Sequence, residues 1–97
     1  MNPNKNRLAS FLVLALAAAV RIKDFKFDPA TLEVAAGETV TWTNGDDEIH
    51  ALVANDGSFH SGGLDGDATF AHTFTAPGTY PYRCTLHPQM SGTIVVH

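Results

Sequence analysis

The sequence predicts an all-β protein, a Greek-key antiparallel β-sandwich of about seven strands, formed by residues 20–97. Three observations support this fold class. Apolar residues recur with period two after residue 20, turn residues interrupt these runs roughly every 8–12 residues, and no segment of the region has a helical period. The 97 residues are enough for one domain.

The first 19 residues differ from the rest and predict a signal peptide. Lys5 and Arg7 precede an apolar run over residues 8–20, and small residues up to Ala19 provide a cleavage site. A retained anchor is the alternative, but these 13 residues are fewer than the roughly 17–25 that span a bilayer. We therefore expect residues 1–19 to be removed, leaving no stable membrane span and a periplasmic or otherwise exported protein.

The charge of the predicted mature region limits its partners. Residues 20–97 contain ten acidic and four basic residues, which gives a net charge of −6 with neutral histidines. This excludes a nucleic-acid partner, which would need a basic face, and favours neutral or basic partners. The chain has one cysteine, so an internal disulfide is impossible. The Cys84 thiol must therefore form an intermolecular disulfide, act as a reactive group or bind a metal. We expect the protein to be a monomer.

The first half of the domain contains four expected strands, at 22–27, 31–34, 39–43 and 50–54. A slip in parity between Ile22 and Phe25 predicts a bend near Lys23-Asp24. The clearest strand is 39–43, where threonines alternate with Val40 and Trp42. Residues 50–54 are apolar on both faces, which indicates a strand covered on both sides.

The second half contains two loops and three more expected strands, at 69–75, 79–84 and 92–96. Asp46-Asp47-Glu48 forms an acidic loop, which we expect to be solvated, with steering of a basic partner as the alternative. Residues 55–67 are rich in Gly, Asp, Asn and Ser and predict a long surface loop. Tyr80, Tyr82 and Cys84 share one face of the strand that precedes the last turn.

Cys84, His87 and Met90 follow the spacing C-x2-H-x2-M, so one tight loop can bring all three side chains to a single ion. Thiolate and thioether sulfur together with imidazole suit copper. A trigonal site of one cysteine and two histidines, with a weak axial methionine, is the electron-transfer copper site. This ligand set needs a second histidine from elsewhere in the chain.

Four histidines are candidates for that ligand: His50, His60, His72 and His97. His97 is terminal, and His60 lies in the glycine-rich loop, where a solvated side chain is expected. His72 lies between two phenylalanines, so we expect it at the edge of the core. His50 is the first residue of the strand that is apolar on both faces, so it lies at a strand end. Cys84 lies at a strand end as well. This argument favours His50 without proving it.

The chain resembles the cupredoxins, or blue type 1 copper proteins, and among them amicyanin and its plastocyanin-like relatives, from about residue 22 to residue 96. The matching motifs are Phe25-x-Phe27-x-Pro29, Gly37-Glu38-Thr39-Val40-Thr41-Trp42-Thr43-Asn44, Asp56-Gly57-x-Phe59, Phe74-Thr75-Ala76-Pro77-Gly78-Thr79-Tyr80 and the segment from Tyr82 to Gly92. The resemblance implies that His50, Cys84, His87 and Met90 bind one copper ion that cycles between Cu(II) and Cu(I).

The resemblance also implies a function. We expect a soluble one-electron carrier, not an enzyme, that exchanges electrons through the exposed edge of His87. Its donor and acceptor would be redox proteins of the cytochrome or dehydrogenase class, bound transiently, and Leu86, Pro88 and Ile49 would form an apolar patch around that edge. The alternative is a periplasmic copper-binding, delivery or resistance protein on the same frame. Such proteins often use methionine clusters, whereas Met90 is the one methionine near this site.

Two of the positions that depart from the pattern of the family bear on the Cys84 sulfur. Ala51 stands where asparagine is common, although its backbone N–H can still reach the Cys84 sulfur. Leu86 stands where amicyanins have proline and so retains an N–H. We expect this N–H to donate a second hydrogen bond to the sulfur and to raise the reduction potential.

Overall fold

The computed structural model describes residues 18–97, so residues 1–17 of the predicted leader lie outside the described part. Within that part the chain forms nine strands and no helix. The strands are β1 (Ala19–Lys23), β2 (Lys26–Asp28), β3 (Thr31–Val34), β4 (Thr39–Asn44), β5 (His50–Ala54), β6 (His60–Leu64), β7 (Thr69–Thr73), β8 (Gly78–Cys84) and β9 (Ser91–Val96). Residues 18–97 therefore contain no apolar helix of membrane-spanning length.

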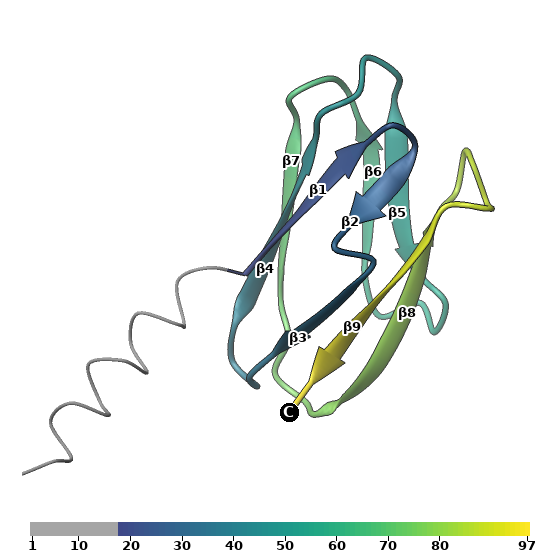
Figure 1. Cartoon of the computed structure of the whole chain (residues 1–97). Helices are drawn as coiled ribbons and strands as arrows, with labels where there is room; N and C mark the ends of the chain where they lie inside the picture. The colour runs from purple at the N-terminus through teal and green to yellow at the C-terminus, as the bar shows by residue number, and fades with distance from the viewer. Residues whose placement is uncertain (1–17) are drawn as a thin grey trace, which may run out of the picture.

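The strands form two sheets that face each other (Figure 1). One sheet has the order β2-β1-β4-β7, and the other has the order β3-β9-β8-β5-β6. Strands distant in sequence lie side by side, as in a Greek key, and the predicted β-sandwich is confirmed. Two pairings, β1 with β4 and β3 with β9, are parallel instead of antiparallel.

The core lies between the sheets and is centred on Trp42. Val40 and Trp42 of β4 are fully buried, as the alternation of the sequence predicts. The indole is surrounded by the rings of Phe59, Phe70, Phe74 and Tyr82, with centroids 5.5–6.4 Å away. Burial of one such side chain contributes roughly 4–6 kcal/mol, so the core provides a rigid frame for the loops at its ends.

Two short strands explain why the structure has nine strands instead of about seven. The bend predicted near Lys23-Asp24 is a tight turn at Asp24-Phe25, where φ is 53° and 60°, and β2 folds back antiparallel onto β1. The predicted surface loop 55–67 contains β6, which pairs with β5 at the edge of its sheet. Only Leu64 of β6 is buried, and the other four residues are exposed or half-buried, which explains why its glycine-rich, polar sequence indicated a loop.

Neighbouring strands bring two predicted ligands together. β5 and β8 are antiparallel neighbours, so the first residue of β5, His50, and the last residue of β8, Cys84, lie at the same end of the sheet. The loop between β8 and β9 projects at that end, and the C-terminus lies at the opposite end (Figure 1).

Candidate metal centre

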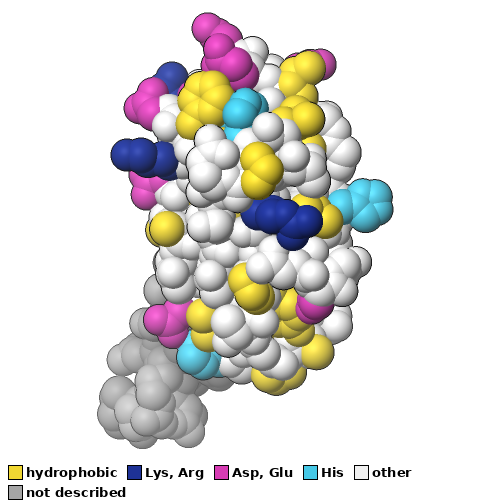
Figure 2. Space-filling model, turned by 90° about the vertical axis from the view of Figure 1, so that its right-hand side faces the viewer, with side chains coloured by type: hydrophobic (Ala, Val, Ile, Leu, Met, Phe, Trp, Pro, Cys, Tyr) yellow, Lys and Arg dark blue, Asp and Glu magenta, His cyan; other side chains and the backbone are white. Residues whose placement is uncertain are grey.

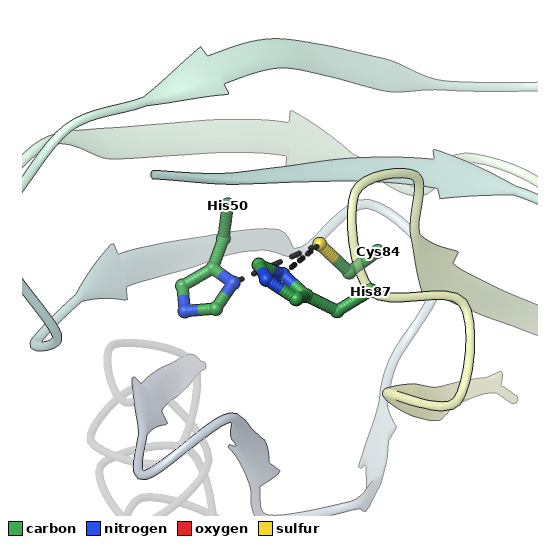
Figure 3. A group of neighbouring side chains, drawn as sticks. All are labelled: His50, Cys84 and His87. Carbon is green, nitrogen blue, oxygen red and sulfur yellow. Dashed lines mark hydrogen bonds between the residues drawn. The ribbon is translucent and has the colours of Figure 1, made fainter. Parts of the chain in front are cut away.

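Three of the four predicted ligands converge at one end of the sandwich. One ligand atom from each of His50, Cys84 and His87 lies within 4.8 Å of the others. The Cys84 Sγ is 3.7 Å from Nδ1 of His50 and 3.7 Å from Nδ1 of His87. Figure 3 shows both imidazole rings turned toward the sulfur. Two of the side chains are fully buried, and His87 is half-buried.

Backbone hydrogen bonds close the loop that contains Cys84 and His87. The N–H of Met90 donates to the carbonyl of His87 over 2.9 Å, and the N–H of Cys84 donates to the carbonyl of Met90 over 3.1 Å. The N–H of Thr85 donates to the carbonyl of Ala51 in β5 over 2.9 Å. Met90, the fourth predicted ligand, ends the loop with a side chain only 3% exposed. The loop is thus held at its base and attached to the neighbouring strand.

One backbone donor reaches the sulfur. The N–H of Ala51 lies 3.5 Å from the Cys84 Sγ, as expected from the sequence. The second donor expected from Leu86 is absent from the bonds that residues 18–97 make, so that prediction is not supported. Leu86 belongs to the solvent-facing part of the loop, with 55% of its surface exposed.

A carboxylate holds the far side of the His50 ring. The Nε2 of His50 is 2.9 Å from Oδ2 of Asp46, and both residues are buried. The same carboxylate accepts hydrogen bonds from the backbone N–H groups of Asp24, over 2.7 Å, and Phe25, over 2.9 Å. Burial opposes ionisation of Asp46, but the hydrogen bonds from Phe25, His50 and Asp24 outweigh it and lower the pKa of Asp46.

Asp46 was missed as a site residue because the acidic triplet was expected to be solvated. That expectation holds for Asp47 and Glu48, which are exposed, but not for Asp46. The local signal is the buried Asn44, whose Oδ1 accepts a hydrogen bond from the N–H of Asp46 over 2.9 Å. This bond holds the backbone of Asp46, four residues before His50.

Phe25 is a second residue that the sequence did not assign to the site. Its ring meets the rings of His50 and His87 edge-on, at centroid distances of 5.1 and 4.8 Å. Together with Ile49 and Leu86 it forms what we call the apical patch, the exposed large hydrophobic residues of the described chain. Figure 2 shows hydrophobic side chains beside a histidine at one end of the molecule, with acidic side chains close by. Pro88 of the expected patch is also exposed.

The remaining histidines lie outside the cluster. His60 is exposed, as expected for a solvated side chain. His72 is half-buried and stacks on Phe59 with a centroid distance of 5.0 Å, which agrees with its expected place at the edge of the core. His97 pairs with Glu33 at the surface over 2.6 Å.

The donor set fits copper. A thiol and two imidazoles on a buried, convergent site match the ligands of an electron-transfer copper centre. A coordinating thiol gives up its proton, and the N–H of Ala51 is in place to donate to the resulting thiolate.

Comparisons with known proteins agree with this geometry. Residues 15–96 match the family model of the cupredoxin-like domain. The chain is 34% identical to amicyanin of Paracoccus denitrificans over 99 residues, which cover 97% of this chain and 76% of that protein. A solved structure of an oxidised amicyanin variant superposes with a TM-score of 0.79 at 32% identity, covering 84% of this chain and 82% of that one. A purple cupredoxin from Nitrosopumilus maritimus superposes with a TM-score of 0.78 at 30% identity, covering 84% of this chain and all of that one.

Proposed function

This chain is a member of the cupredoxin family, and we propose that it is a soluble one-electron transfer protein with a mononuclear type 1 copper site. The observation on which the proposal depends is the convergence of His50, Cys84 and His87 within 4.8 Å. We assign these three residues and Met90 as the copper ligands. When bound, copper supplies a couple between Cu(II) and Cu(I), and a weak axial Met90 helps to set its potential.

The frame around these residues suits electron transfer because it restrains them in advance. His50 and Cys84 belong to neighbouring strands, and the loop to Met90 is closed by its own backbone. Ligands held in this way move little between oxidation states, so that reorganisation is small. Relatives of this class also support the prediction that the chain is not an enzyme.

We propose that electrons enter and leave through the edge of His87, which is the most exposed of the three clustered residues. The apical patch lies around it and supplies an apolar contact for a partner. Redox encounters use small interfaces, so a patch of this size is sufficient. The partners would be a donor and an acceptor of the cytochrome or dehydrogenase class, bound transiently by a monomer.

The exposed acids beside the patch provide a test of how a partner approaches. Asp47 and Glu48 are exposed one and two residues after the buried Asp46. If they steer a basic partner, then Asp47→Asn with Glu48→Gln lowers the association rate at low salt and flattens its dependence on ionic strength. An unchanged salt dependence would leave them as solvated loop residues.

We further propose that the protein functions in the periplasm or another exported space after removal of residues 1–19. The basic start and the apolar run of the sequence support this location. N-terminal sequencing of the exported protein measures the cleavage position directly, and a protein that keeps Met1 would contradict the proposal.

Visible and EPR spectra of the copper-loaded protein test the proposed function. We expect an intense thiolate-to-copper band and a type 1 EPR signal in the native protein, and neither in Cys84→Ser. Rapid electron self-exchange should accompany them. A colourless Cu(I) complex that releases its metal readily, with slow self-exchange, would instead support the copper-delivery alternative.

A further inference from the structure

We propose that Asp46 is the positioning residue of this metal centre: one buried carboxylate orients His50 toward Cys84 and fixes the turn that places Phe25 against both imidazoles. The inference rests on the proposed copper site, but it does not depend on which redox partners the protein has. It is carried by three hydrogen bonds that meet at one side chain.

The first step concerns the orientation of His50. A neutral imidazole has one N–H and one lone pair. Oδ2 of Asp46 lies 2.9 Å from Nε2, and this acceptor selects the form in which Nε2 carries the proton. The lone pair of Nδ1 then faces the Cys84 Sγ, 3.7 Å away. A carboxylate behind a histidine ligand fixes the orientation of the ring and raises its basicity, and here the pair is shielded from water because His50 is fully buried.

The second step concerns the turn between β1 and β2. Oδ1 of Asp46 accepts the N–H of Asp24, and Oδ2 accepts the N–H of Phe25. Both turn residues have left-handed φ values, 53° and 60°. Such a conformation is unfavourable for a residue with a Cβ, and two N–H groups directed at one anion compensate for it. The carboxylate of Asp46 is thus the anion that both N–H groups of this turn bind.

The third step joins the two. The turn that Asp46 fixes carries Phe25, whose ring lies edge-on to His50 and His87 at 5.1 and 4.8 Å. Loss of the carboxylate therefore has two effects at once. It frees the His50 ring, and it releases the aromatic side chain that covers one side of both imidazoles. No other acid of the loop can substitute, since Asp47 and Glu48 are exposed.

The test compares Asp46→Asn with the matched control Asp47→Asn, which removes the same charge from the adjacent, exposed position. The amide introduced by Asp46→Asn keeps one acceptor oxygen. Its N–H₂ group takes the place of the other oxygen and cannot accept a hydrogen bond from the donors there. Competition with a Cu(I) chelator measures binding of Cu(I) alone. We expect Asp46→Asn to weaken Cu(I) binding by about 10–100-fold, and Asp47→Asn to change it by a few-fold at most.

NMR supplies a readout that does not depend on electron transfer. In the diamagnetic Cu(I) form, the Nε2–H proton of His50 should exchange slowly with water in the native protein and in Asp47→Asn, and rapidly in Asp46→Asn. The contacts between the ring protons of Phe25 and those of His50 and His87 should also weaken. Cu(I) affinity and proton exchange in Asp46→Asn that match those of Asp47→Asn would overturn the proposal.

Two further arms keep the result decisive. If Asp46→Asn fails to fold, Asp46→Glu retains a carboxylate and should recover Cu(I) binding. A folded Asp46→Glu protein that binds Cu(I) about 10–100-fold more weakly than the native protein would overturn the proposal. If the native protein does not bind Cu(I), the proposed function fails. Proton exchange at His50 in the metal-free native protein and in Asp46→Asn then still decides whether Asp46 orients the ring.

Discussion

The hydroxyl of Tyr82 is buried without a partner, and its removal should stabilise the protein. Tyr82 is 1% exposed, and its Oη makes no hydrogen bond to residues 18–97; the same holds for Nε1 of Trp42. An unpaired buried group of this kind costs about 1–3 kcal/mol. Tyr82→Phe keeps the ring and removes only the oxygen. Because some packing around that oxygen is lost, we expect the free energy of unfolding to rise by about 1 kcal/mol.

Denaturant and thermal unfolding of the metal-free protein measure this change. A gain of about 1 kcal/mol corresponds to an increase in Tm of roughly 4–8 °C for a domain of this size. Tyr80→Phe is the matched control, because Oη of Tyr80 donates to the carbonyl of Ala76 over 2.6 Å. That substitution should cost about 0.5–1.5 kcal/mol. If Tyr82→Phe is destabilised as much as Tyr80→Phe, the Tyr82 hydroxyl has a partner such as a buried water, and the reasoning fails.

The same hydroxyl predicts the response to alkali. Burial raises the pKa of Tyr82 to about 12, and the nearby N–H of Trp42, which does not reach hydrogen-bond geometry, acts in the opposite direction. The unfolded tyrosine loses its proton near pH 10, before the folded one. Stability is therefore full below about pH 10 and falls as the pH approaches 12, by up to roughly 2–3 kcal/mol. Tyr82→Phe should lack this part of the decrease, which unfolding curves across that pH range would show.

Two other predictions concern packing and the start of the domain. Gly92→Ala should lower the free energy of unfolding by about 1–3 kcal/mol, because a Cβ would lie 2.5 Å from Oη of Tyr82; a wild-type midpoint in urea would contradict this. A protein that begins at Ala18 should be more stable than one that begins at Val20 by about 0.5–1.5 kcal/mol, since the carbonyl of Ala18 accepts the N–H of Thr41 over 3.1 Å. Equal melting temperatures for the two proteins would refute it.

The sequence predicts the fold correctly where a single strand shows its own alternation of apolar and polar residues. The alternation in β4 identifies Val40 and Trp42 as buried, and both are. The sequence does not show which strands pair, so the parallel neighbours β1 and β4 were not expected. A bend near Lys23-Asp24 was predicted, but not that it reverses the chain at Asp24-Phe25, where both N–H groups bind a carboxylate about twenty positions away along the chain.

The site divides in the same way. The loop residues Cys84 and His87 are evident from their spacing, and His50 from its place at a strand end, and the structure brings all three together. Asp46 and Phe25 are not evident, since their roles exist only after distant segments meet. The expected hydrogen bond from the N–H of Leu86 to the Cys84 sulfur is not among the bonds of residues 18–97, for a related reason. The sequence shows that this N–H is present but not where it points.

The positions of Ala18 and His97, the two ends of the described part of the chain, have a consequence for how the molecule can be attached to other structures. The first residue of β1, Ala19, lies farther from His50 than the last residue of that strand does. The C-terminus lies opposite the loop between β8 and β9 (Figure 1). Any tether joined ahead of Ala18 or after His97 would therefore leave the His87 end pointing outward. A fusion partner, a membrane anchor or an electrode linker at either position would leave the proposed site of electron exchange at His87 free to meet a diffusing protein.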